Sequence, residues 1–156
     1  MRYLLLPLLL WNFTVHANMV EIPLKKCGNM LFVELELNSK KAWFLIDTGA
    51  SISLIDYHKR RFFQIKCSRQ HRFLTQGMNS SQARTYRTSG YCLQYQDNIL
   101  TIPLMSISMI QLCEHIYKKY KLYISGIIGS DFLSKHQARI DYERNIITIK
   151  VKKALE

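Results

Sequence analysis

The segment Ala42–Ser51, with the sequence AWFLIDTGAS, joins a continuous apolar run to a short polar loop. The run Ala42–Ile46 is apolar on both faces, which predicts a β-strand buried on both sides. The carboxylate of Asp47 follows directly, and an ionised group is costly to bury without hydrogen-bond partners. Thr48 supplies a hydroxyl, and Gly49 lacks the Cβ that would keep another backbone at a distance. The segment therefore predicts a core strand that ends in a structural or a functional carboxylate.

The sequence on both sides of this segment predicts mainly β-structure. Residues 31–37 alternate between apolar and charged side chains, which indicates a half-buried strand that forms a hairpin with residues 42–46. Further strands are predicted at 52–55, 99–104, 138–142 and 146–151, with a long exposed hairpin over 73–95 and short helices over 107–120 and 130–135. We expect an all-β domain with one or two short helices.

Length and composition restrict the class of protein. The chain has 156 residues, of which 48% are hydrophobic, enough for the core of one domain. Its formal net charge of +11 favours encounters with anions but specifies no chemistry. No apolar run approaches the roughly 18–20 residues of a membrane-spanning helix. We therefore expect no transmembrane span in the mature chain.

The first 17 residues resemble an export signal. A basic start at Arg2 precedes the apolar stretch 3–11, and small residues at Val15 and Ala17 suit a signal peptidase. We expect residues 1–17 to be removed, leaving 18–156 as one domain that is periplasmic or secreted. Export would place the four cysteines in an oxidising compartment, where either disulfides or buried thiols are compatible with the sequence. Their spacing is not of a zinc-binding type, so no metal site is expected.

The motif Phe44–Ser51 resembles the active-site loop of the retropepsin-like aspartic proteases. Downstream, Ile127, Ile128 and Gly129 resemble the element that braces this loop in the family, and residues 130–133 resemble the helix that follows it. Residues 138–149 resemble the closing hairpin of bacterial single-domain members. The resemblance implies a retropepsin-like closed acid-protease β-barrel.

The resemblance also implies a function, an aspartic endopeptidase that hydrolyses peptide bonds in polypeptide substrates. Such an enzyme needs two carboxylates that share one proton across a water molecule. The sequence contains only one Asp-Thr-Gly loop, so the resemblance implies a homodimer with one Asp47 from each copy. Thr48 would bond into the partner's loop, and Gly49 would lend its amide to the carboxylates. No cofactor or metal is expected.

The same resemblance assigns several residues to substrate binding. Ala50 and Ser51 would line the site, and a flap over residues 74–90 would close on the peptide, with Gly77 at a candidate turn position. Family members with a hydroxyl at the position of Ala50 add a hydrogen bond to the charged dyad, so alanine predicts a mildly acidic to near-neutral pH optimum. Asp131 and Asp141 are expected to be structural, with Asp131 bonding to backbone near the catalytic loop.

Two other interpretations remain open from the sequence. The first is a retropepsin-like binding or scaffold protein that does not cleave peptides. The second is a basic anion-binding module that uses a cluster of cations, namely Lys59, Arg60, Arg61, Lys66, Arg69 and Arg72. No recognised nucleic-acid motif accompanies this cluster, so a specific nucleic-acid partner is not expected.

Overall fold

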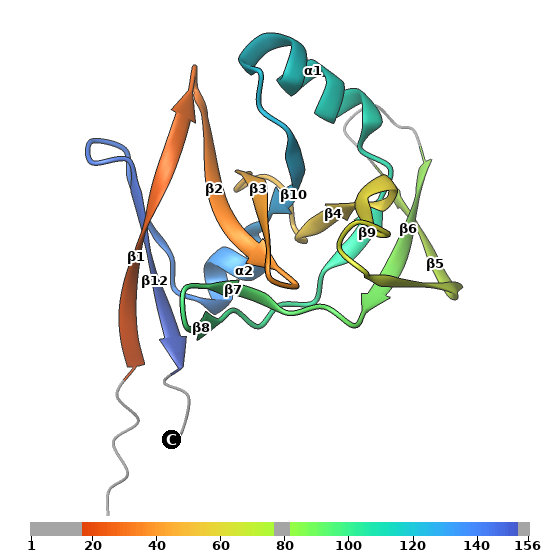
Figure 1. Cartoon of the computed structure of the whole chain (residues 1–156), viewed down its shortest axis with the longest axis horizontal. Helices are drawn as coiled ribbons and strands as arrows, with labels where there is room; N and C mark the ends of the chain where they lie inside the picture. Colours follow the sequence, from red (N-terminus) through yellow and green to blue (C-terminus); the bar gives the residue numbers. More distant parts are fainter. Residues whose placement is uncertain (1–16, 77–81, 153–156) are drawn as a thin grey trace, which may run out of the picture.

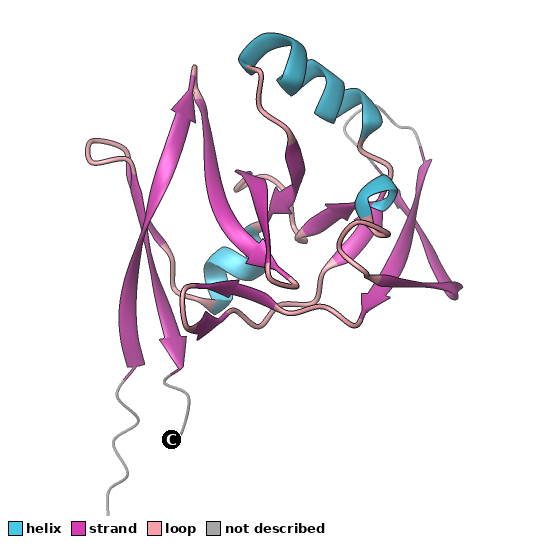
Figure 2. Ribbon diagram, in the orientation of Figure 1, coloured by secondary structure: helices cyan, strands magenta, loops and turns pink. Residues whose placement is uncertain are grey.

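The computed structural model describes residues 17–76 and 82–152, and most of its regular structure is β-strand (Figure 1, Figure 2). The strands are β1 (Ala17–Cys27), β2 (Met30–Leu37), β3 (Lys40–Ile46), β4 (Leu54–Asp56), β5 (Lys66–Gln76), β6 (Gln82–Ser89), β7 (Leu93–Tyr95), β8 (Asn98–Ile99), β9 (Met105–Ile107), β10 (Ile124–Ile128), β11 (Arg139–Asp141) and β12 (Ile146–Lys152). The helices are α1 (Ile110–Tyr120), α2 (Ser130–Lys135) and the single-turn 3-10 helix η1 (Tyr57–Lys59). The predicted all-β class with two short α-helices is confirmed.

The centre of the sheet brings together segments that are far apart in the sequence. The main path of strand pairing runs β11-β12-β1-β2-β3-β10-β4-β9-β6-β5. β10 lies parallel to β3, with Ile128 opposite Ile46, and antiparallel to β4, with Ile127 opposite Leu54. The predicted apolar strand is therefore flanked on both sides, by β2 and β10, as its two apolar faces require.

β1 is a strand that the sequence pattern does not reveal. It pairs with β12 from Ala17 to Pro23 and then with β2 from Leu24 to Cys27. Pro23, which has no N–H to donate, lies where the strand changes partners. A proline among charged residues weakens the strand pattern, although Ile22 and Leu24 alternate into the core as the geometry demands.

Two groups of buried side chains fill the interior. The larger lies between β1, β2, β3, β12 and α2 and includes Val33 and Phe44. The smaller, which we call the α1 core, consists of Phe32, Leu45, Met109, Ile116, Leu122, Ile124 and Ile127. Successive residues of a strand point to opposite faces, so β2 and β3 contribute to both cores. Helix α1 covers the face of the sheet that carries Leu45.

The predicted strand over residues 99–104 is only partly correct. Its alternation of burial is present, with Leu100, Ile102 and Leu104 all buried. However, β8 ends at Ile99, and the hydroxyl of Tyr91 takes over as a hydrogen-bond partner for the backbone beyond it. This hydroxyl donates to the carbonyl of Ile102 over 2.5 Å and accepts the amide of Leu104 over 2.8 Å. Pro103 contributes no amide, so a continuous ladder does not form.

The first residues of α1 and of the β5–β6 hairpin also differ from expectation. Residues 105–107 form β9, and the helix begins at Ile110 rather than 107 because the carboxylate of Asp56 accepts the amide of Met109 over 3.0 Å. β5 begins at Lys66, seven residues before the start of the hairpin that the sequence predicted over 73–95. The hairpin of β5 and β6 is otherwise as predicted, and its turn lies outside the described residues.

The four cysteines are unpaired and half-buried in the structure. This arrangement matches the thiol alternative of the sequence interpretation. Neither α1 nor α2 has the length and apolar character needed to cross a membrane, a statement that applies to residues 17–76 and 82–152. The predicted export signal lies outside the described residues, apart from Ala17.

Candidate active site

The loop that carries Asp47 continues directly from the central pair of strands. The amide of Asp47 donates to the carbonyl of Ile128 over 3.0 Å, which adds one more bond to the pairing of β3 with β10. The amide of Gly49 donates to Oδ1 of Asp47 over 2.9 Å, and the amide of Ala50 donates to the carbonyl of Asp47 over 3.2 Å. The carboxylate is therefore fixed at the end of a rigid strand by its own loop.

The exposure of the loop differs from residue to residue. Asp47 is half-buried, whereas Thr48, Gly49 and Ser51 are exposed and Ala50 is half-buried. An ionisable group that is fixed by one amide and still open to one side is available for chemistry or for contact with another molecule. The predicted residues 47–51 thus lie together at one surface, while Gly77 lies outside the described residues.

The segment Ile127–Gly129 lies directly beneath this loop. The amide of Ser130 donates to the carbonyl of Ala50 over 2.8 Å. A Cβ on Gly129 would lie 2.7 Å from the carbonyl oxygen of Ile52 and 2.8 Å from that of Ala50, so only glycine allows this approach. Ile127 and Ile128 are buried within β10. The structure thus brings the second predicted motif against the first.

Ser53 joins the loop to helix α2. Its fully buried hydroxyl donates to Oδ1 of Asp131 over 2.7 Å and accepts the amide of Gly129 over 2.9 Å. Its own amide donates to Oδ2 of Asp131 over 3.0 Å. These bonds confirm the expected structural role of Asp131. The structural role expected for Asp141 is also confirmed, because its carboxylate accepts the amides of Glu143 and Arg144 over 2.9 Å each in the β11–β12 turn. The role of Ser53 was missed, although its place between two apolar residues marks it as a buried hydroxyl.

An apolar wall adjoins the carboxylate. Ala50 and Leu54 pack against the α1 core, which also contains Leu45 and Ile127. Leu45 precedes Asp47 by two residues, so both side chains belong to the same face of the strand. Helix α1 therefore covers the apolar surface next to the candidate catalytic group.

A second group of ionisable side chains lies between η1 and α1. Asp56 is only 4% exposed, and the ammonium of Lys59 donates to the carbonyl of Ile124. The thiol of Cys113 contacts the same carbonyl at 3.8 Å. Burial lowers the pKa of Lys59, and burial together with the negative charge of Asp56 raises the pKa of Cys113 to about 11. These groups hold α1 against β10 and are suited to a structural role.

The cation cluster considered from the sequence is partly engaged within the protein. Lys59 donates to the carbonyl of Ile124, as described above. Arg60 donates through Nη1 to the carbonyl of Tyr57 over 2.8 Å, and its guanidinium lies 3.8 Å from the centre of the Tyr57 ring. Arg61 and Lys66 are exposed, and Arg69 and Arg72 belong to β5. Lys59 and Arg60 are thus committed to local contacts.

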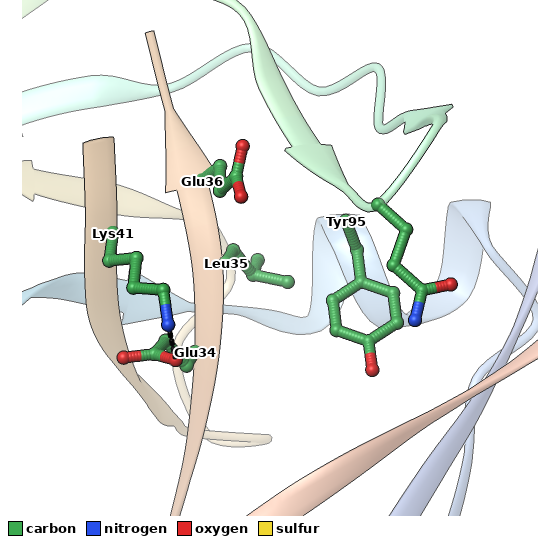
Figure 3. Close-up of a pocket in the computed structure, with 6 residues that line it drawn as sticks. Glu34, Leu35, Glu36, Lys41 and Tyr95 are labelled. Carbon is green, nitrogen blue, oxygen red and sulfur yellow. Dashed lines mark ion pairs between the residues drawn. The ribbon is translucent and has the colours of Figure 1, made fainter. Parts of the chain in front are cut away.

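A shallow pocket of about 160 Å³ lies away from this loop (Figure 3). It is lined by residues of β2, β3 and the β7–β8 turn, namely Glu34, Leu35, Glu36, Lys41, Tyr95 and Gln96. Lys41 extends to Glu34 at 3.4 Å, as the dashed line in Figure 3 shows. Lys41 precedes Asp47 by six positions, roughly 20 Å along an extended strand. The pocket is therefore not part of the candidate site.

No cluster of three or more His, Cys, Asp or Glu side chains suited to a metal ion occurs within residues 17–76 and 82–152. Within the loop 47–51, Asp47 is the residue with an ionisable carboxylate. Activation of water by carboxylates alone requires a second carboxylate close to the first.

No protein-family model and no curated protein sequence matches the chain significantly. Solved structures do match. The retroviral protease-like domain of Ddi1 from Leishmania major aligns with a TM-score of 0.55 at 18% identity, over 79% of this chain and 92% of that domain. A retropepsin-like aspartic protease from Rickettsia conorii aligns with a TM-score of 0.51 at 12% identity, over 86% of this chain and 91% of that one.

A third match is the EIAV protease in complex with the inhibitor HBY-793, with a TM-score of 0.52 at 12% identity. The alignment covers 75% of this chain and 97% of that protease. At these identities the likeness establishes the fold. The chain has the retropepsin-like fold that the sequence motifs predicted.

Proposed function

We propose that the chain is an aspartic endopeptidase that works as a homodimer, with Asp47 of each copy forming the catalytic dyad. The observation that carries this proposal is the half-buried carboxylate of Asp47, fixed by the Gly49 amide at the open end of a core strand within a retropepsin-like fold. Because the sequence has one Asp-Thr-Gly loop, one chain supplies half of the site.

The proposed reaction uses two carboxylates and one proton. Two carboxylates held close together do not both ionise, so the dyad carries one shared proton. The ionised carboxylate takes a proton from a bound water, which attacks the scissile carbonyl carbon, while the protonated carboxyl donates its proton to the carbonyl oxygen. Collapse of the tetrahedral intermediate then returns a proton to the leaving amine. No metal or cofactor takes part.

The geometry of the loop supports this division of work. The Gly49 amide engages Oδ1 of Asp47, and none of the residues in 17–76 and 82–152 donates a hydrogen bond to Oδ2. Oδ2 is therefore available to a water or to the second carboxylate. The exposed Thr48 and Gly49 would form the contact with the partner's loop around a two-fold axis.

The substrate would be an extended polypeptide bound as a strand, held by main-chain hydrogen bonds and selected by apolar pockets. Ala50 and Ser51 would line the site beside the dyad, with Gly77 in the flap above it.

We also propose that residues 1–17 direct export and are removed. Cleavage after Ala17 would leave the pairs from Asn18–Val151 to Pro23–Ile146 intact in the β1–β12 ladder.

Cleavage of an unfolded protein by the purified chain tests the proposal. We expect product peptides from the wild type, none from the Asp47→Asn variant, and inhibition by a pepstatin-type transition-state mimic. The Asp141→Asn variant is the matched control, because Asp141 serves a surface turn far from the loop in sequence. Thermal melting would establish that each variant is folded.

Equal cleavage by the wild type and the Asp47→Asn variant would remove the mechanism. Absence of cleavage by a folded wild-type dimer would favour the non-cleaving binding protein instead.

A further inference from the structure

Lysines from two distant parts of the sequence gather at one end of the molecule. Lys25 and Lys26 are exposed near the end of β1, and Lys119 and Lys121 are exposed at the C-terminal end of α1. We call these four residues the lysine patch. The β1–β2 turn contacts α1, since a Cβ on Gly28 would lie 2.8 Å from the hydroxyl oxygen of Tyr120. Figure 1 shows this turn beside that end of the helix.

Aromatic rings form the base of the lysine patch. Lys25 lies 5.6 Å from the ring centre of Trp43, and Lys119 lies 5.2 Å from that of Tyr120. Lys121 lies 5.4 Å from the ring centre of Tyr117. Such contacts orient ammonium groups without neutralising their charge.

The lysines of the patch form no ion pair with any other residue that the structure describes. Among the residues that the structure describes, the one ion pair on α1 joins Glu114 to Lys118 over 3.9 Å, and none involves a member of the patch. A group of like charges that remains unpaired at a surface attracts an anionic partner. The patch therefore has the electrostatic character of a binding surface.

The patch shares a face of the sheet with Asp47. Lys25 lies opposite Phe32, and Phe32 lies opposite Leu45, so their side chains point to the same side. On β3, the side chains of Trp43 and Leu45 point to the same face of the sheet. Asp47 follows Leu45 by two residues and continues this face. Through these pairs Lys25 lies two strands from Leu45, about 10 Å across the sheet, and Leu45 precedes Asp47 by two residues, about 7 Å along β3, so the backbones of Lys25 and Asp47 are about 12 Å apart. An extended peptide of about four residues covers the same distance.

We propose that the lysine patch binds an acidic stretch of the polypeptide substrate, about four residues from the scissile bond. The inference rests on the proposed function and specifies the substrate class of that site. In a two-fold dimer each copy contributes one patch, so acidic residues on either side of the scissile bond would be favoured.

An acidic peptide fits the patch better than a nucleic acid or a membrane does. All four cations are lysines, whereas arginine with its planar fork is the usual choice for phosphate and nucleic-acid recognition. Each of the three rings beneath the patch already contacts one of its lysines. The ring of Tyr117 also stacks on that of Tyr123, with 4.2 Å between their centres. The exposed aliphatic residue of α1, Ile110, lies at the opposite end of the helix from Lys121.

Binding is tested without cleavage in the full chain carrying Asp47→Asn. The probe is a fluorescein-labelled peptide with a run of glutamates, and the reference peptide carries glutamines at the same positions. We expect the glutamate peptide to bind about tenfold more tightly at low salt, and the difference to vanish at high salt. A triple Lys25→Gln, Lys26→Gln, Lys119→Gln change should abolish the preference.

A matched triple change of exposed cations elsewhere, Lys135→Gln, Arg139→Gln and Lys150→Gln, removes the same charge and should leave the preference intact. In the active chain, kcat/KM should be highest when the glutamates lie about four residues from the scissile bond. Loss of preference in both triple variants would show a general charge effect and overturn the assignment.

The outcomes separate this inference from the proposed function. Cleavage of both peptides with equal kcat/KM would overturn the acidic preference while the protease remains. Absence of all cleavage, with patch-dependent binding of the glutamate peptide, would overturn the protease and leave the surface. Tighter patch-dependent binding of a single-stranded oligonucleotide or of phosphatidylserine vesicles than of the glutamate peptide would overturn the acidic peptide as the partner.

Discussion

Ser53 couples the loop that carries Asp47 to the rest of the protein through three hydrogen bonds. Its hydroxyl serves both Asp131 and the amide of Gly129, and that glycine lies against the carbonyls of the loop. A buried donor or acceptor that loses its partner costs about 1–3 kcal/mol. The loop is therefore held through the buried hydroxyl of Ser53.

We expect Ser53→Ala to lower the free energy of unfolding by about 1–3 kcal/mol. The melting temperature should fall by about 3–10 °C for a domain of this size. Because the loop carries Asp47, cleavage should fall further than the folded fraction does. Ser134→Ala on the exposed side of α2 is the control, and equal melting temperatures for both variants would contradict the role of Ser53.

Ala50 leads to a prediction for the pH dependence. A serine there would add a hydroxyl beside the dyad, and a hydrogen bond to the charged form favours ionisation. Ala50→Ser should therefore move the optimum of kcat/KM to lower pH by about one unit. The wild-type optimum should lie in the mildly acidic to near-neutral range. A wild-type profile that peaks near about pH 2–3 would refute this explanation.

Single residues were predicted from the sequence to different degrees. Asp47, Thr48 and Gly49 form a local motif, so their placement in one loop follows from a few consecutive positions. Ser53 acts through Asp131, which lies 78 residues away, and such a pair is visible only once the chain is folded.

Helix α1 is held by buried ionisable groups rather than by a side-chain N-terminal cap. Met109 at its beginning makes no capping bond through its side chain, and its amide is satisfied by Asp56. Lys59 and Cys113 meet at the carbonyl of Ile124 on the strand that follows the helix. The N-terminal part of the helix is thus tied to β4 and β10.

The raised pKa of Cys113, about 11 against an ordinary value of 9.0, predicts slow alkylation. The thiolate is the reactive form, and a folded pKa above the unfolded value keeps the thiol protonated below about pH 9. At about pH 8 the thiolate fraction, and with it the rate, should be about a hundredfold lower than in the denatured chain. Mass spectrometry of iodoacetamide-treated protein measures this ratio for each cysteine.

Asp56→Asn is the matched variant for this experiment. The amide oxygen can still accept the Met109 bond, but the negative charge that raises the pKa of Cys113 is removed. Alkylation of Cys113 should become faster. An unchanged rate in the folded variant would show that simple burial, rather than charge, protects the thiol.

Helices and strands whose apolar residues recur with a clear period were predicted well. Segments whose backbone hydrogen-bond partners lie far away in the sequence were not. β2 and β3 follow from alternation and from an apolar run. Residues 100–104 alternate equally well, but the Tyr91 hydroxyl bonds to their backbone in place of a neighbouring strand. β1 is stabilised by β12, more than a hundred residues away, and Pro23 hides its pattern.

For the whole molecule, the proposed dimer predicts how activity responds to mixing. When equal amounts of wild-type and Asp47→Asn chains exchange freely, about a quarter of the dimers contain two intact acids. Activity per total chain should therefore fall to about a quarter of the wild-type value rather than to half. Mixing with Asp141→Asn should cause no loss. A strict proportion to the wild-type fraction would mean that each chain works alone.

The pairing of β3 with β10 has a consequence for biosynthesis. Ile46 can pair with Ile128 only after the ribosome has added 82 further residues. At a translation rate of about 5–20 residues per second, this takes on the order of 4–16 s. Until then the apolar strand AWFLI has one unprotected edge while the nascent chain is still attached to the ribosome. Chaperone contact during translation is expected to concentrate on this strand and to end once β10 has emerged.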